Sequence, residues 1–108
     1  MPSVKVLGEI PQKDEGSVIN IIVAKVAQRL AAPASAVKVS ILGSQYANSR
    51  SKIMVEVNYK PAEERTPEVL TAMSREITAE LWRYFPTRSK KIVTYTVAME
   101  NFSSSDDL

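Results

Sequence analysis

The sequence predicts a single α/β domain made of two successive β-α-β units. Three observations support this class. Short stretches in which apolar and polar residues alternate, as in strands, stand before and after two longer stretches with helical periodicity. A proline ends each helical stretch, and 108 residues suffice for one hydrophobic core. We therefore expect residues 1–108 to form a four-stranded mixed sheet with both helices on one face.

The first unit, residues 2–43, contains a strand, a helix and a second strand. Alternation over residues 4–7 predicts the first strand. After a turn, apolar residues recur at helical spacing as far as Ala32, and Pro33 ends this helix. The second strand alternates again, and its apolar members are Val37, Val39 and Ile41.

The second unit, residues 52–98, repeats this order after a polar connector. Its first strand, residues 53–59, has one apolar face, and Met54, Glu56 and Asn58 form the other. Thr66 and Pro67 are a strong helix start, because threonine accepts an amide hydrogen bond and proline suits the first helical position. The apolar stripe of this helix consists of Val69, Leu70, Met73, Ile77 and Leu81. A last strand starts at residue 92.

Composition limits the functional classes. Fourteen basic and twelve acidic residues give a net charge of +2, which is too weak to indicate a nucleic-acid partner. The chain has no cysteine and no histidine, which excludes disulfides and disfavours a transition-metal site. No stretch resembles a signal peptide or a membrane-spanning helix, so we expect a cytoplasmic protein without a membrane partner. Residues 101–108 are expected to form a polar tail.

Pro2 is the residue that says most about function. If Met1 is removed, as small second residues generally permit, Pro2 carries a free secondary amine, a base that no side chain supplies. An α-amino group has a pKa near ~8, and a low-polarity pocket with nearby cations lowers it. The structural alternative is a proline that merely occupies a sheet edge. If Met1 is retained, the nitrogen is an amide and has no basicity.

Pro2 at the head of a strand, a helix, and then residues 28–41 (Gln-Arg-Leu-Ala-Ala-Pro-Ala-Ser-Ala-Val-Lys-Val-Ser-Ile) together resemble the tautomerase superfamily. The doubled length is similar to fused members such as macrophage migration inhibitory factor and malonate semialdehyde decarboxylase. The resemblance extends to about Met99 and implies a homotrimer whose sheets surround a central barrel, with sites between subunits. It also implies proline-dependent isomerisation, or a related decarboxylase- or dehalogenase-like reaction, on a small 2-oxo or enol carboxylate, without a cofactor.

The same resemblance implies a set of site residues around the general base. Lys38 stands where the small tautomerases have a basic substrate-binding residue, and Lys13 lies near their other arginine. Lys60 belongs to a turn that is similar to one in the decarboxylase-like members. These three lysines would bind the carboxylate of the substrate. Two aromatic residues would shape the pocket, namely Tyr46 and Tyr95.

Other interpretations of these residues stay open at this point. Each lysine could be a solvated charge and each tyrosine a packing residue, in which case the chain is a non-catalytic trimer with the same fold. The β-α-β-β-α-β order is also that of the ferredoxin-like fold, which serves as an RNA-binding or regulatory module. The aromatic ribonucleoprotein motif is missing, which argues against RNA.

Structural roles are expected for two further groups of residues. The charged stretch Glu63-Glu64-Arg65 precedes the second helix and is interpreted as solvated. The aromatic residues at the end of that helix are interpreted first as part of the core or of a subunit interface, and a wall of a ligand site is the lesser alternative. They are Trp82, Tyr84 and Phe85.

Overall fold

A computed structural model describes residues 2–43, 52–86 and 91–99 of the chain. Its strands are β1 (Ser3–Leu7), β2 (Lys38–Leu42), β3 (Ile53–Tyr59) and β4 (Ile92–Ala98). Its helices are α1 (Glu15–Leu30) and α2 (Pro67–Tyr84), with short 3₁₀ turns η1 (Gln12–Asp14) and η2 (Ala34–Ala36). The predicted tail at residues 101–108 lies outside the described residues.

The four strands form one sheet in the order β2-β1-β3-β4. β1 is parallel to β2, β3 is parallel to β4, and β1 and β3 run antiparallel in the centre. Each helix therefore joins two neighbouring strands. In the ferredoxin-like fold a third strand separates the two strands that each helix connects. The strand order confirms the duplicated β-α-β arrangement and excludes the ferredoxin-like alternative.

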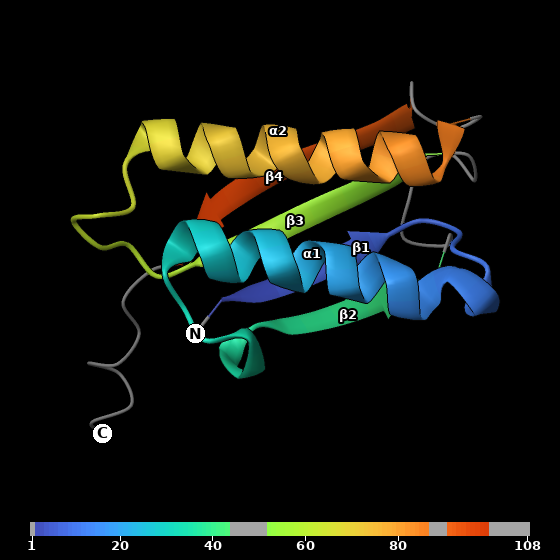
Figure 1. Ribbon diagram of the computed structural model, residues 1–108, viewed down its shortest axis with the longest axis horizontal. Helices are drawn as coiled ribbons and strands as arrows, with labels where there is room; N and C mark the ends of the chain where they lie inside the picture. The colour runs from blue at the N-terminus through green and yellow to red at the C-terminus, as the bar shows by residue number, and fades with distance from the viewer. Residues whose placement is uncertain (1, 44–51, 87–90, 100–108) are drawn as a thin grey trace.

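Both helices pack side by side on one face of the sheet, as Figure 1 shows. The strand residues that face them are apolar because the side chains of a strand alternate between the two faces. The helices contribute the stripes that the periodicity predicts, with Val69 and Leu70 only partly buried. The fully buried side chains are Val4, Val6, Val18, Ile22, Val26, Leu30, Ile53, Val55, Val57, Met73, Ile77 and Leu81.

The helix ends follow local chemistry. α1 ends at Leu30, two residues before the predicted end at Ala32, because Ala31 adopts a left-handed conformation with φ 52° and ψ 46°. At the start of α2, the hydroxyl oxygen of Thr66 accepts a hydrogen bond of 3.3 Å from the amide of Val69, as predicted. Neither helix in the described part of the chain combines the length and hydrophobicity needed to cross a membrane.

The other sheet face is not covered by helices, and its side chains lie in three rows that cross all four strands. Every second residue of a strand points to this face and lies opposite a residue of the neighbouring strand, so each row contains one residue from each strand. The first row is Lys38, Ser3, Asn58 and Val97. The second is Ser40, Lys5, Glu56 and Tyr95, and the third is Leu42, Leu7, Met54 and Val93. We call this surface the open face.

Candidate functional site

Pro2 immediately precedes β1 and is buried. Its carbonyl oxygen accepts a hydrogen bond of 3.2 Å from the backbone amide of Lys38, which holds the start of β2 beside it. β3 runs antiparallel to β1, so its last residues and the following Lys60 reach the same edge of the sheet. Figure 1 shows that the N-terminus, the start of β2 and the ends of β3 and α1 all lie on this side. We call this part of the molecule the Pro2 edge.

The Pro2 edge therefore brings together three of the predicted site residues. Lys38 and Lys60 are both exposed. Lys38 is the first residue of β2, Lys60 follows the last residue of β3, and both strands pair with β1. Two exposed lysines whose backbone positions lie at this edge give it positive charge, which can attract a small anion. A cationic environment also disfavours the protonated form of an amine.

Lys13 lies elsewhere in the same chain. It belongs to η1, which follows β1, whereas Pro2 precedes β1. A strand of this length separates its two ends by about 16 Å, and Figure 1 shows η1 and the N-terminus at opposite sides of the molecule. One chain alone does not place Lys13 beside Pro2. The predicted pocket residue Tyr46 lies outside the described residues.

Tyr95 is also distant from Pro2 within one chain, because β3 separates β4 from β1. Strands in a sheet are spaced by about 4.8 Å, so β4 lies roughly 10 Å from β1. The Tyr95 hydroxyl donates a hydrogen bond of 3.0 Å to Oε1 of Glu56. Partial burial, together with this bond to a carboxylate and its negative charge, raises the pKa of Tyr95. Its hydroxyl is thus a protonated donor that already has an acceptor.

Glu56 is the centre of a polar network on the open face that the sequence interpretation did not assign to any site. Its Oε2 accepts a hydrogen bond of 3.0 Å from Nδ2 of Asn58, and Lys5 lies opposite it in the sheet. The bond from Asn58 is the largest cause that lowers the pKa of Glu56, while burial opposes it and Tyr95 and Lys5 assist. The available sequence signal was Glu56, which together with Asn58 interrupts the apolar residues of this strand.

We expect the Glu56 network to make stability depend on pH. A carboxyl whose pKa is lower in the folded chain stabilises the fold above its unfolded pKa, and this contribution is lost as the pH falls through its folded pKa. Glu56→Gln should therefore destabilise the protein at about pH 6 and much less at about pH 3. Urea unfolding at both values measures this difference. If the stability difference between wild type and Glu56→Gln is the same at both pH values, the role given to Glu56 is contradicted. Tyr95→Phe should make this stability difference depend less on pH, because it removes one of the bonds that lower the pKa of Glu56.

The interpretation of Glu63-Glu64-Arg65 as solvated charges is wrong for Arg65. Its side chain is part-buried, and Nη1 donates a hydrogen bond of 2.8 Å to the carbonyl oxygen of Lys60. Nη2 donates a hydrogen bond of 3.0 Å to the carbonyl oxygen of Leu30, the last residue of α1. Nε is buried and has no hydrogen-bond partner in the described structure. A charged residue before a helix gives no sequence signal of these long-range contacts.

The aromatic residues at the end of α2 are only partly in the core. Phe85 is buried, whereas Trp82 is 46% exposed and Tyr84 is 38% exposed. Tyr84 stacks edge-on against Phe85 and donates a hydrogen bond of 2.8 Å to Oδ1 of Asp14. The interpretation as core packing is therefore correct for Phe85 and wrong for Trp82.

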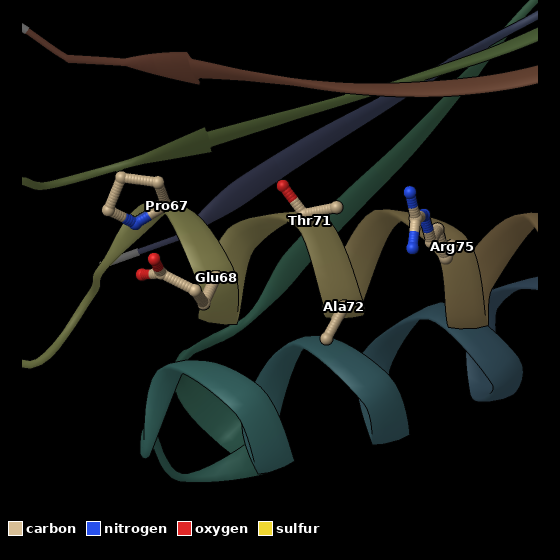
Figure 2. Close-up of a pocket in the computed structure, with 5 residues that line it drawn as sticks. All are labelled: Pro67, Glu68, Thr71, Ala72 and Arg75. Carbon is tan, nitrogen blue, oxygen red and sulfur yellow. The ribbon is translucent and has the colours of Figure 1, made fainter.

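Two hollows on the surface lie away from these residues. One, of about 380 Å³, follows the outer side of α2 from Pro67 and Glu68 to Arg75 (Figure 2). In Figure 2, Thr71 and Ala72 lie between these ends. The other hollow, of about 280 Å³, lies where β1 and β2 end, and Gly8, Glu9, Ile10, Glu15, Ile41, Leu42 and Gly43 line it. Among the described residues, no group of acidic side chains is arranged to hold a metal ion. Neither hollow contains a predicted site residue.

Solved structures resemble this chain over most of its length, although no family model and no curated protein matches its sequence. A member of the cis-3-chloroacrylic acid dehalogenase family superposes with a TM-score of 0.78 at 13% identity, covering 94% of this chain and 77% of its own. A fused 4-OT, solved as an asymmetric trimer, gives 0.73 at 12% identity, covering 92% and 87%. MIF2 of Leishmania major gives 0.71 at 12% identity, covering 92% and 89%. These structures belong to the tautomerase superfamily, so the chain has the fold of that superfamily, as its sequence predicts.

Proposed function

We propose that this protein is a homotrimeric enzyme that transfers a proton within a small 2-oxo or enol carboxylate. The general base is the secondary amine of Pro2 after removal of Met1. The observation that carries this proposal is the Pro2 edge, where a buried Pro2 heads β1 beside Lys38 and Lys60. Structures with the same fold include a member of a dehalogenase family and trimeric 4-OT proteins, which supports an enzyme of this kind.

The chemistry follows from the groups at this edge. An unprotonated secondary amine takes a proton from the carbon next to a carbonyl group and returns it to another carbon or oxygen of the same molecule. Lys38 and Lys60 bind the carboxylate and stabilise the negative charge of the enolate as it develops. Lysine does this as a point charge, without the bidentate geometry of arginine. A Pro2 that stayed protonated would serve as an acid in a decarboxylase- or dehalogenase-like reaction instead.

A neighbouring subunit completes the site in this proposal. The open face exposes Val93 by 45% and Val97 by 39%, and contact with other copies would remove these side chains from water. Lys13 lies at the opposite end of β1, so a second copy would supply it to the Pro2 edge. Tyr95 would reach the pocket in the same way, and Tyr46 would be a second wall of it.

Mixed trimers test whether Lys13 comes from a neighbour. Trimers of Pro2→Ala chains and trimers of Lys13→Ala chains should each be weakly active. When equal amounts are unfolded and refolded together, about one quarter of the sites should combine an intact Pro2 with an intact Lys13 from the next chain. Activity should then rise above that of either parent. The control mixes Lys13→Ala with the double variant and should show no gain. An absence of recovery in the first mixture would place Lys13 outside the site.

A non-catalytic trimer is the second candidate, and the engaged Tyr95 hydroxyl favours it because this hydroxyl already donates to Glu56. Intact-mass spectrometry of the protein from its own cells separates the two candidates. If the protein is the proposed enzyme, its mass should be lower than that of the full sequence by one methionine. It should also sediment as a trimer, and the wild type should ketonise phenylenolpyruvate. A retained Met1 would leave the fold without its base and establish the non-catalytic candidate.

A further inference from the structure

We propose that Arg65 is a positioning residue of the Pro2 edge, which sets the place of Lys60 by bridging two backbone carbonyls. The inference deepens the proposed function, because it depends on Lys60 as a carboxylate ligand. It concerns a residue that does not itself touch the substrate. The contacts of Arg65 with Lys60 and Leu30 carry the argument.

The two bridged carbonyls belong to the two segments that lead to the two lysines. Lys60 is the first residue after β3, and Leu30 is the last residue of α1, from which the chain turns at Ala31 towards β2 and Lys38. One guanidinium therefore ties the end of β3 to the end of α1. Its planar group donates from two nitrogens in a fixed geometry, whereas a lysine ammonium could not hold the same fork.

The backbone of Arg65 is itself held in place, so its side chain has a fixed base. The amide of Arg65 donates a hydrogen bond of 3.0 Å to the carbonyl oxygen of Ala62, which closes the turn before α2. The next residue, Thr66, caps α2. The positive charge also lies at the C-terminal end of α1, where the helix dipole favours a cation. The backbone of Arg65 is therefore fixed relative to α2, and its side chain in turn fixes the carbonyl group of Lys60.

Stability alone does not explain this arrangement. Nε of Arg65 is buried without a hydrogen-bond partner in the described structure, and an unsatisfied buried donor destabilises a fold. Among the described residues, no carboxylate forms an ion pair with Arg65. A lysine would avoid the unsatisfied Nε, but its single nitrogen would have to reach both carbonyls from one point, without the separate donors Nη1 and Nη2. That an arginine occupies this position is better explained by its role in holding the two bridged segments in place.

The test compares Arg65→Lys and Arg65→Gln with the matched control Arg75→Lys, which lies on the exposed outer side of α2. Arg65→Lys should raise KM for phenylenolpyruvate about tenfold, because Lys60 is no longer held in the position from which it binds the carboxylate. We expect kcat to change by less than about twofold, because Pro2 still transfers the proton. Amide hydrogen exchange over residues 60–66 should become faster in both Arg65 variants and stay unchanged in the control.

A double-mutant cycle separates positioning from general destabilisation. If Arg65 acts through Lys60, then Arg65→Lys combined with Lys60→Ala should give the KM of Lys60→Ala alone. Additive effects on KM, or an unchanged KM in Arg65→Lys, would overturn the inference while leaving the role of Pro2 intact. If the wild type has no activity, the proposed function is rejected and hydrogen exchange decides about the bridge. Equal exchange in Arg65→Lys, Arg65→Gln and the control would then overturn it.

Discussion

Pro2→Ala should lower kcat/KM for the ketonisation of phenylenolpyruvate by about 10²–10⁴-fold, the usual contribution of a general base. The variant replaces a cyclic secondary amine, whose ring holds the nitrogen in one direction, with a mobile primary amine. The fold should persist, because the hydrogen bond at this position uses the carbonyl oxygen of Pro2 and not its nitrogen. Initial rates of wild type and variant, with intact masses that prove equal loss of Met1, measure the effect.

Pro86→Ala is the matched control for this experiment, since Pro86 is exposed and follows α2, far along the chain from β1. It should retain the wild-type rate. The pH dependence is a second test, because a general base requires kcat/KM to rise as the pH increases through the pKa of the amine. Equal rates for wild type and Pro2→Ala would remove Pro2 from the mechanism. A rate that falls with pH would favour Pro2 as an acid.

Gly8→Ala should reduce the free energy of unfolding by about 3 kcal/mol, through backbone strain and overpacking together. Gly8 follows β1 with φ +138°, a conformation that residues with a side chain rarely adopt. A Cβ atom there would lie 2.5 Å from the carbonyl oxygen of Lys52 and 3.2 Å from Cα of Ile53. Both contacts are with backbone at the start of β3, so no side chain can move aside.

Gly16→Ala is the control, because a Cβ atom at this position in α1 meets no atom within 4 Å. Alanine favours the helix, so this variant should be more stable than the wild type by about 0.5 kcal/mol. Urea unfolding of the three proteins at one concentration gives both differences. Equal stability of Gly8→Ala and wild type would contradict the close approach of the two central strands.

Much of the fold could be predicted from local patterns. Alternation over residues 53–59 correctly placed Glu56 and Asn58 on the face opposite the core, and helical spacing identified all of the buried residues of both helices. The cap by Thr66 was also correct. The predicted end of α1 was wrong by two residues, because an alanine in the sequence does not indicate the left-handed conformation that Ala31 adopts.

The candidate site was predicted less completely, because its geometry depends on residues far apart in the chain. The sequence placed Pro2 at the head of a strand, and the structure adds that Lys38 and Lys60 share its edge. The separation of Lys13 from Pro2 arises because β1 carries the chain away from Pro2 before the turn that contains Lys13. Tyr95 is distant from Pro2 because β3 lies between β4 and β1.

The sequence by itself determined which residues form strands and helices, which side of each is apolar, and that Pro2 stands at the head of the first strand. Periodicity carries this information because side-chain direction repeats within a strand or helix. Only the tertiary structure decided the strand order, the row that joins Lys5, Glu56 and Tyr95, and the bridge from Arg65 to Leu30. These features arise from pairing between segments that are distant in the chain, and no local pattern specifies such pairing.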